Sequence, residues 1–292
     1  MLIFAPEIPM GPEEFRLLRD FIYQYCGLHF SEDSKYILEK RLGRRLQELK
    51  LNSYKDYYYY LRYNNARDQE LTELINLLTT NETYFFREEF QLRSFNEEII
   101  PELCERKLAA GGDKRLRIWS AGCSTGEEPY TIAMLLLENP AVRDWQIDIV
   151  GTDISQRVLQ LARKGLYPES SFRSTDERYR RTYFRAQDGK WLIDDGVRRL
   201  VTISHLNLFD TPRVALLGRM DVIFCRNVII YFDQPAKKRV IETFFQRLVP
   251  GGYLLLGHSE SLMNITTLFD LKHLQHDMVY QKPQETAGGG RP

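Results

Sequence analysis

The segment from Trp119 to Pro129 combines glycines with acidic residues in a spacing that could hold a cofactor; it reads Trp-Ser-Ala-Gly-Cys-Ser-Thr-Gly-Glu-Glu-Pro. Gly122 and Gly126 allow the backbone to approach a ligand closely, and a helix that begins near Glu127 presents unpaired amides to a polar group. A G-x-x-x-G spacing is weak evidence by itself. Between a strand and a helix, it indicates a ligand-binding turn.

A carboxylate follows in the segment Gly151-Thr152-Asp153. At the carboxyl end of the second strand of an α/β sheet, Asp153 could accept hydrogen bonds from ribose hydroxyls, so the two features together predict a nucleoside site. They do not distinguish NAD from S-adenosylmethionine. The methyl donor is favoured because the glycine spacing is not G-x-G-x-x-G, because no Walker-type lysine follows, and because Glu127 and Glu128 would repel a pyrophosphate.

The two glutamates have a second interpretation. Acidic residues in the first turn of a helix complement its dipole, which contributes about 0.3–1 kcal/mol. We expect at least one of Glu127 and Glu128 to face the cationic sulfonium or ammonium group of the donor instead.

These residues must be positioned by an α/β domain. After the loop 109–113, short apolar segments alternate with helical ones, which is typical of a parallel sheet covered by helices. The predicted strands are 116–120, 147–152, 200–204, 221–225 and 252–257, and the first two predicted helices are 127–138 and 155–163.

The alternation stops over residues 166–199, where Asp188-Gly189 lies between aromatic and aliphatic residues. An Asp-Gly pair in this setting predicts a β-hairpin, and hence a small antiparallel insertion. We expect the α/β domain to span 97–283 and residues 284–292 to be a disordered tail.

Residues 12–96 predict a helical amino-terminal domain, because apolar residues recur at steps of three and four. Within it, residues 35–50 carry six basic side chains against two glutamates. Such a face is usually a solvated helix exterior. Its alternative role is a docking surface for an acidic partner.

Bulk composition narrows the function classes. The 292 residues include 40 Lys and Arg and 40 Asp and Glu, so the zero net charge gives no general attraction to nucleic acid or a membrane surface. No secretory signal or membrane-spanning run is found, and we expect a cytoplasmic location. The five histidines do not have metal-ligand spacing, and the four cysteines contain no C-x-x-C pair, so we assign neither a metal nor a disulfide.

Three further segments carry a family resemblance: Asn81-Glu-Thr-Tyr-Phe-Phe-Arg-Glu88, Phe224-Cys-Arg-Asn-Val-Ile-Ile-Tyr-Phe232 and Gly251-Gly-Tyr-Leu-Leu-Leu-Gly-His-Ser-Glu-Ser261. With 121–129 and 151–154, they closely resemble the chemotaxis-receptor glutamate O-methyltransferases of the CheR type, from about Pro12 to Lys282. The resemblance implies a helical domain followed by a Rossmann-like methyltransferase domain with a small antiparallel insertion. It also implies S-adenosylmethionine as donor, S-adenosylhomocysteine as product and glutamates of methyl-accepting chemotaxis receptors as acceptors.

The resemblance also implies which residues bind the cofactor. One group lies in the Asn81 segment and the others follow the predicted strands. Cys123 departs from the small residue expected in the turn, and we interpret it as a compact filler. The implied cofactor-binding residues are Asn81, Thr83, Arg87, Gly122, one of Glu127 and Glu128, Asp153, Asn207, Leu208, Arg226 and Asn227.

The chemistry of the implied reaction is simple. Glutamate has a reference pKa near 4.3, so the acceptor is already an anion at neutral pH and needs no general base. Direct in-line displacement is the simplest mechanism. Arg87 is our candidate for orienting the acceptor carboxylate, because a guanidinium can donate two parallel hydrogen bonds. The alternative is an ion pair with Glu88, Glu89 or another acidic neighbour. Tyr231 either closes the site beside the methyl group or only packs.

The implied partners are cytoplasmic helices of the receptors, for which the basic helix 35–50 is a candidate docking surface. The insertion 166–199 is a second candidate, and the sequence does not show whether it tethers a receptor tail. We expect a monomer that neither enters the membrane nor binds nucleic acid. The alternative function is a non-catalytic regulator that senses S-adenosylmethionine or S-adenosylhomocysteine. Methylation of a nucleic-acid amine is disfavoured, because Arg226-Asn-Val-Ile-Ile-Tyr231 lacks the prolines of the Asn/Asp-Pro-Pro-Tyr type of motif.

Overall fold

A computed structural model describes residues 8–284. The described residues form two compact units, one within Met1–Thr80 and Tyr231–Asp233 and the other within Asn81–Ile230 and Gln234–Pro292. Residues 81–96, which the sequence analysis assigned to the helical domain, thus group with the second unit. Residues 285–292 of the tail that we expect to be disordered lie outside the described part.

The first unit is a small helical bundle, as the apolar spacing predicts. Its helices bury residues three or four positions apart, such as Phe15, Leu18 and Ile22 on the first helix and Leu38, Leu42 and Leu46 on the second. The elements are α1 (Pro12–Cys26), η1 (Glu32–Ser34), α2 (Lys35–Glu48), α3 (Tyr54–Tyr63) and α4 (Arg67–Leu78).

The basic helix α2 does not expose all of its cations. Arg45 donates two hydrogen bonds to the buried carboxylate of Glu70, at 2.9 Å and 2.6 Å, and the Tyr57 hydroxyl donates to Glu70 at 2.7 Å. Arg41 donates to the carbonyl of Leu78. These two arginines therefore tie α2 to α4, and only part of the predicted basic face remains available to a partner.

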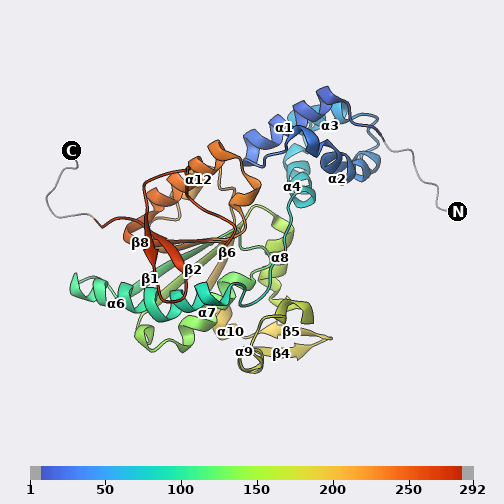
Figure 1. Cartoon of the computed structure of the whole chain (residues 1–292). Coiled ribbons are helices and arrows are strands. Elements are labelled where there is room, and N and C mark those ends of the chain that lie inside the picture. Colours follow the sequence, from blue (N-terminus) through green and yellow to red (C-terminus); the bar gives the residue numbers. More distant parts are fainter. Residues whose placement is uncertain (1–7, 285–292) are drawn as a thin grey trace, which may run out of the picture. The chain divides into compact units, whose positions relative to one another are not determined.

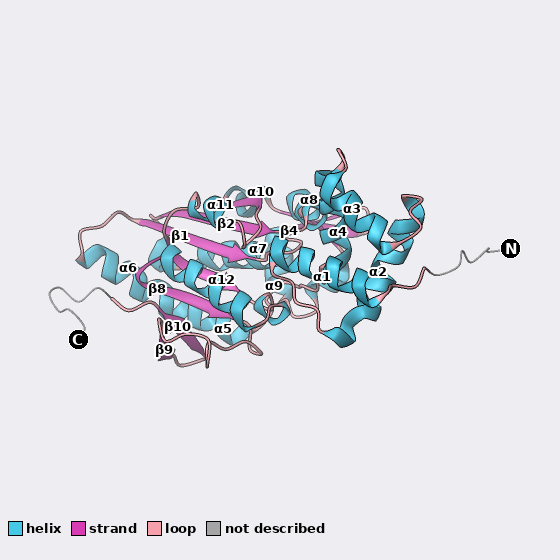
Figure 2. Cartoon of the chain, turned by 90° about the horizontal axis from the view of Figure 1, so that it is seen from above, coloured by secondary structure: helices cyan, strands magenta, loops and turns pink. Residues whose placement is uncertain are grey.

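The second unit is built on a seven-stranded sheet of order β6-β2-β1-β7-β8-β10-β9 (Figures 1 and 2). The first five strands are parallel, which confirms the predicted α/β fold. The last two strands are antiparallel and were not predicted. The strands are β1 (Arg115–Ala121), β2 (Gln146–Asp153), β6 (Val201–His205), β7 (Met220–Cys225), β8 (Leu248–Leu256), β9 (Asp270–His273) and β10 (Met278–Gln281).

Helices cover both faces of this sheet. Figure 1 shows α12 on one face and α6 and α7 on the other. The strand order reverses between β1 and β7, because β2 and β6 follow on one side and β8 on the other, and ligands of such sheets bind at this switch point. The helices and the π-helical turn η2 are α5 (Glu89–Ser94), η2 (Phe95–Ile99), α6 (Ile100–Ala109), α7 (Glu127–Glu138), η3 (Pro140–Val142), α8 (Gln156–Lys164), α11 (Thr211–Ala215), η5 (Ile229–Tyr231) and α12 (Gln234–Arg247).

A subdomain is inserted between α8 and β6, as predicted. Its three strands pair antiparallel in the order β3-β5-β4, and the Asp188-Gly189 hairpin joins β4 to β5. Both turn residues have positive φ, 49° and 72°, as a two-residue turn between twisted strands requires. The elements are β3 (Leu166–Tyr167), η4 (Glu169–Phe172), α9 (Glu177–Tyr183), β4 (Phe184–Gln187), β5 (Lys190–Ile193) and α10 (Asp195–Arg199).

An aromatic cluster explains why the Asn81 segment belongs to this unit. The Phe85 ring lies 4.7 Å from Tyr167, 5.1 Å from Phe172 and 5.0 Å from Phe184, all in the inserted subdomain. Phe95 continues the contact by packing its ring 5.1 Å from Phe224 of β7. Residues 81–96, which the sequence pattern assigns to the helical domain, are therefore held by the core of the second unit.

None of the helices in residues 8–284 has both the length and the apolar character needed to cross a bilayer.

Candidate active site

The predicted site residues of the second unit gather at the carboxyl edge of its parallel strands. Gly122 follows β1, Asp153 ends β2, Asn207 follows β6 and Arg226 follows β7. Because the strands are parallel and adjacent, these four positions meet at one edge of the sheet, on both sides of the switch point between β1 and β7.

The glycine turn has the close approach that its composition predicts. Gly122 has a φ of 85°, and a Cβ at this position would lie 2.3 Å from a methyl carbon of Val228. The amides of Gly122 and Cys123 both donate to the carbonyl of Thr152 at 2.8 Å, which fixes the turn to the end of β2. A side chain at Gly122 would therefore separate the turn from the loop that follows β7.

Cys123 is buried beside this turn. It is 1% exposed, and its sulfur would be 3.2 Å from a Cβ at Gly151. Burial raises the pKa of the Cys123 thiol well above its usual value, so the side chain stays neutral. It fills space between two strands rather than providing a nucleophile.

Asp153 is held rigidly at the end of β2. Its carboxylate accepts hydrogen bonds from the amides of Ser124 at 2.9 Å and Ser155 at 2.8 Å. Burial raises the pKa of Asp153, and the backbone amides partly oppose that shift. Each oxygen keeps a further lone pair, so the carboxylate can accept from a ligand hydroxyl without losing these bonds.

The two adjacent glutamates have different environments. Glu127 accepts hydrogen bonds from Thr125 at 2.6 Å and from Ser171 of the inserted subdomain at 3.1 Å, and burial raises its pKa. Glu128 accepts from Ser120, at the end of β1, at 2.7 Å. Glu127 thus faces the insertion, whereas Glu128 faces the switch point.

Arg226 lies between two carboxylates at the carboxyl edge of the parallel strands, and these three residues are called the charged centre. Its side chain is 3% exposed and pairs with Glu128 at 2.6 Å and with Glu88 at 3.5 Å. It also donates to the backbone carbonyl of Arg87 at 2.8 Å. One guanidinium between two carboxylates leaves a formal charge of −1, which favours a cationic ligand.

The Asn81 segment is joined to this centre by its backbone as well as by Glu88. The Ser124 hydroxyl donates to the carbonyl of Asn81 at 3.2 Å, and the amide of Phe86 donates to Thr131 at 3.2 Å. Phe86 and Glu88 have φ values of 60° and 59°, which cost on the order of 1–3 kcal/mol each in residues other than glycine. Surrounding contacts hold this strained segment in place.

Arg87 lies in the same segment but its side chain turns away from the charged centre. It donates to the carbonyl of Glu82 at 3.2 Å, and its guanidinium lies 5.7 Å from the centre of the Tyr84 ring. In the described part of the chain it forms no ion pair, so the alternative pairing with Glu88 or Glu89 is wrong for this structure; Glu88 pairs with Arg226 instead.

The remaining predicted residues are Thr83, Asn207 and Leu208 of the second unit and Tyr231 of the first. Asn207 accepts a hydrogen bond from the amide of Phe209 at 3.0 Å and is followed by half-buried Leu208, while Thr83 is half-buried in the Asn81 segment. Tyr231 groups with the first unit, where its carbonyl accepts from the amide of His29 at 3.0 Å.

Asn227 offers an acceptor to a ligand. Its Oδ1 atom is buried and has no hydrogen-bond partner in the described part of the chain. A buried acceptor left unpaired is costly, and a ligand donor would satisfy it. This atom, the glycine cradle and the net negative charge fit a ligand with hydroxyl, amine and cationic groups. Within residues 8–284, no group of three or more His, Cys, Asp or Glu side chains could hold a metal ion.

Glu88 and Ser120 complete the network around Arg226 and Glu128, although no site role was predicted for either from the sequence. Glu88 was considered only as a partner of Arg87 because the two are adjacent in sequence. Its left-handed φ turns it toward Arg226 instead, and no sequence pattern marks that turn. Ser120 was assigned only to a strand, although its place before the turn was a usable signal.

Comparisons with known proteins match both units. The family model "CheR methyltransferase, SAM binding domain" matches residues 81–278, and "CheR methyltransferase, all-alpha domain" matches residues 13–79. A chemotaxis protein methyltransferase 2 of Vibrio cholerae is 38% identical, with 96% of each chain covered. Chemotaxis protein methyltransferases of Borreliella burgdorferi and Vibrio parahaemolyticus are 36% and 34% identical, with 89% and 94% of this chain and 92% and 98% of theirs covered.

Proposed function

Because the chain belongs to the CheR methyltransferase family, we propose that it methylates glutamate side chains of chemotaxis receptors, giving methyl esters and S-adenosylhomocysteine. The S-adenosylmethionine-binding domain of the family covers every strand-edge residue of the candidate site. The observation that carries the proposal is the Glu88–Arg226–Glu128 network at the switch point, since its negative charge suits a cationic methyl donor.

The donor is expected to lie across the switch point. In our proposal Asp153 accepts from the ribose hydroxyls, and Glu128 rather than Glu127 faces the ammonium group of the methionine part. Asn227 accepts a hydrogen bond through its unpaired Oδ1 atom. Gly122 keeps the turn close to the ligand. The other residues proposed to contact the donor are Asn81, Thr83, Arg87, Asn207, Leu208 and Arg226.

The bound donor supplies a methyl group on a sulfonium: its transfer forms a carbon–oxygen bond to the glutamate as the carbon–sulfur bond breaks and its electron pair stays on sulfur. No proton moves in this step, so no side chain has to act as a base. The task of the protein is alignment, and holding two reactants in line can lower the barrier by several kcal/mol.

Arg87 is proposed to orient the acceptor. Its guanidinium is half-buried and not committed to a carboxylate, so it can turn from the Glu82 carbonyl toward a receptor glutamate. A guanidinium grips a carboxylate through two parallel hydrogen bonds, which fixes the plane of the attacking oxygen. Tyr231 is proposed to close the site beside the methyl group.

The receptor is proposed to dock on α2 and on the inserted subdomain. On α2, Lys40 and Arg44 are exposed, whereas Arg41 and Arg45 make internal contacts. These two exposed cations complement an acidic receptor helix.

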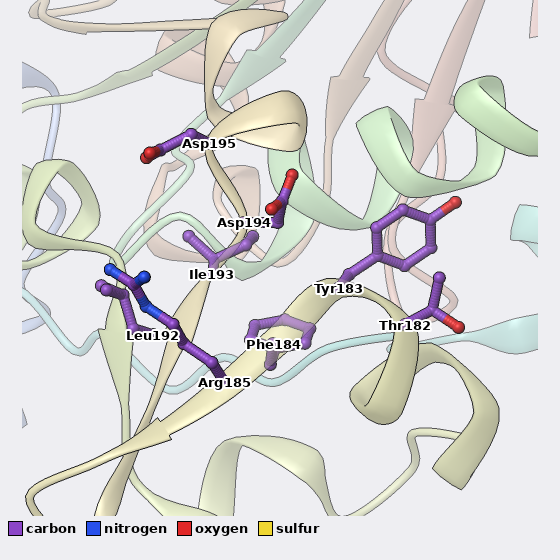
Figure 3. Close-up of a pocket in the computed structure, with 8 residues that line it drawn as sticks. All are labelled: Thr182, Tyr183, Phe184, Arg185, Leu192, Ile193, Asp194 and Asp195. Carbon is purple, nitrogen blue, oxygen red and sulfur yellow. The ribbon is translucent and has the colours of Figure 1, made fainter.

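The inserted subdomain offers a pocket of about 200 Å³ to a receptor tail (Figure 3). It is lined by 182–185 and 192–195 and so combines aromatic side chains with Arg185, Asp194 and Asp195. We propose that it contributes to holding an extended peptide segment. We also propose that the protein works in the cytoplasm as a monomer.

Methylation of purified receptor by S-adenosylmethionine with a labelled methyl group tests the function. We expect the label to enter the receptor, to be released as methanol by mild base, and to be lost when receptor glutamates are changed to glutamine. Label that resists base would contradict ester formation. Binding of S-adenosylhomocysteine without any transfer would support the alternative of a non-catalytic regulator, which the matched methyltransferase family does not favour.

A further inference from the structure

The carboxylate of Glu260 binds the backbone of the loop that follows Arg226. Glu260 follows β8, and its Oε2 atom accepts hydrogen bonds from the amides of Asn227 and Gly257, both at 2.8 Å. Its Oε1 atom accepts from the amide of Ile230 at 3.1 Å. One side chain thus fixes both ends of the segment 227–230 to the end of the neighbouring strand.

The segment that Glu260 holds is strained and tightly packed. Asn227 has a φ of 59°, which is unfavourable for a residue with a side chain. Val228 reaches so near to the glycine turn that a Cβ at Gly122 would be 2.3 Å from it. A small shift of this segment would therefore move Arg226 and Asn227 and would also change the turn that follows β1.

Gly257 leaves no space for an alternative arrangement. A Cβ at this position would lie 2.9 Å from Asn227 Nδ2, 3.0 Å from Asn227 N and 3.0 Å from Glu260 Oε2. The backbone at Gly257, directly after β8, the Asn227 amide and the Glu260 carboxylate are thus in mutual contact. The Glu260 carboxylate and the Asn227 backbone occupy the space that a side chain at position 257 would need.

We propose that Glu260 is a positioning residue for methyl transfer, which holds Arg226 and Asn227 in the conformation that binds S-adenosylmethionine. It acts through the backbone of residues 227–230. The strain at Asn227 is balanced by the hydrogen bond that its amide donates to Glu260, and the buried Oδ1 of Asn227 is thereby kept at the strand edge, where a ligand donor can reach it.

The role requires an ionised carboxylate rather than any polar side chain. Both oxygens of Glu260 face backbone N–H groups, so each must be an acceptor. Burial raises the pKa of Glu260, and the surrounding amides lower it. In Glu260→Gln, an NH2 group replaces one of the two carboxylate oxygens. In either orientation of the side-chain amide, this NH2 donor would face a backbone N–H donor.

Binding of S-adenosylhomocysteine, measured by calorimetry, tests the inference. Glu260→Gln is expected to weaken binding by about tenfold or more, since a buried bond is lost and a donor is left unpaired. The matched control is Asp221→Asn, at the opposite end of β7. Asp221 is a buried carboxylate that accepts from the amide of Arg117 at 2.8 Å and pairs with Lys107 at 2.7 Å. It should lower the melting temperature but change the affinity by less than about twofold.

Two outcomes would overturn the inference: a folded Glu260→Gln protein with normal affinity, or equal losses of affinity in both variants at matched loss of stability. Should Glu260→Gln not fold, Gly257→Ala tests the same contact, because its Cβ displaces the Asn227 backbone without removing a charge. Normal affinity in Gly257→Ala would also overturn it.

The inference rests on the proposed donor site, and its test does not need a receptor. If wild-type protein binds S-adenosylhomocysteine but does not methylate receptors, the proposed substrate fails while the role of Glu260 is still measured. If wild-type protein does not bind S-adenosylhomocysteine, both proposals fail.

Discussion

Each unit of this protein buries an arginine among carboxylates, and the two clusters differ in how their charge is balanced. In the helical unit, Arg45 binds Glu70 through its Nε and Nη2 groups and pairs with Glu48 at 2.9 Å, and the Tyr57 hydroxyl donates a further hydrogen bond to Glu70. At the strand edge of the second unit, Arg226 lies between Glu88 and Glu128. Glu48 also pairs with Arg44, so the first cluster contains two arginines and two glutamates and is neutral overall, whereas the second keeps one negative charge.

The difference separates a structural cluster from a binding cluster. The Arg45 cluster joins two helices of a bundle, and all of its groups are satisfied by one another. The Arg226 cluster lies at a topological switch point, beside the unpaired Oδ1 of Asn227 and a turn that has no room for a side chain at Gly122. Excess charge and an unpaired acceptor are features that a ligand, rather than the fold, would compensate.

Matched substitutions of the two arginines should separate these roles. Arg226→Met is expected to reduce methylation by about a thousandfold or more, because breaking a buried ion pair costs about 3–5 kcal/mol and leaves two carboxylates side by side in the donor site. Arg45→Met should lower the free energy of unfolding by a similar amount but leave the affinity for S-adenosylhomocysteine unchanged. Chemical denaturation and calorimetry measure the two effects.

A loss of affinity in Arg45→Met, measured where the protein is fully folded, would remove the distinction between the clusters. So would an Arg226→Met protein that still methylates at the normal rate. Circular dichroism at the assay temperature is the control for folding in both variants.

Arg87 should affect turnover without affecting stability. Arg87→Ala is expected to lower kcat/KM for the receptor by about a hundredfold, as for the loss of one aligned donor in an active site, with little change in melting temperature. The control is Arg173→Ala. Arg173 lies over the same Tyr84 ring, 3.8 Å from its centre, but pairs with the exposed Glu82. Equal effects of the two substitutions would mean that Arg87 acts only by packing on Tyr84.

Substitutions of Glu127 and Glu128 should have smaller effects, which differ between the two residues. Glu128→Gln is expected to weaken S-adenosylhomocysteine binding by about tenfold, because it removes a charge beside the Arg226 guanidinium. Glu127→Gln should leave affinity unchanged. Because burial raises the pKa of Glu127, its ionised form disfavours folding near neutral pH, so this variant should be at least as stable as the wild type at pH 7.

The effect of Glu127→Gln on stability should depend on pH. As pH falls and Glu127 becomes protonated in the folded protein, the wild type loses that penalty, so the stability difference from Glu127→Gln should shrink. Urea unfolding at pH 7 and pH 5 measures it. A difference that grows on acidification, or reduced affinity in Glu127→Gln alone, would reverse the assignment of the two glutamates.

Much of the fold could be predicted from periodicity alone. The predicted helix 127–138 has the bounds that the structure gives, and the Asp188-Gly189 hairpin forms as its turn chemistry requires. Strands β9 and β10 were missed because each has only four residues, and every residue of β9 is exposed. Without a buried face, such a strand has no hydrophobic pattern to detect.

The candidate site was predictable where its residues follow strands, because parallel strands bring their carboxyl ends together. Gly122, Asp153 and Arg226 meet for that reason. The contacts of Glu88 and Glu260 were not predictable. Glu88 reaches Arg226 through a left-handed turn, and Glu260 binds the backbone amides of the loop that follows Arg226. Sequence spacing contains no information on such long-range contacts.

The smallest expected effect concerns the exposed cations of α2, which lie outside the internal contacts of the Arg45 cluster and are proposed to bind the receptor. Arg41 and Arg45 are committed to internal contacts, so charge reversal there would mix stability with binding. Lys40→Glu with Arg44→Glu avoids this problem. Exposed charges mainly steer encounter, so receptor methylation should fall by a few-fold and become less sensitive to salt. Lys237→Glu with Lys238→Glu on α12 matches the change in net charge; an equal loss in that control would show that only net charge matters.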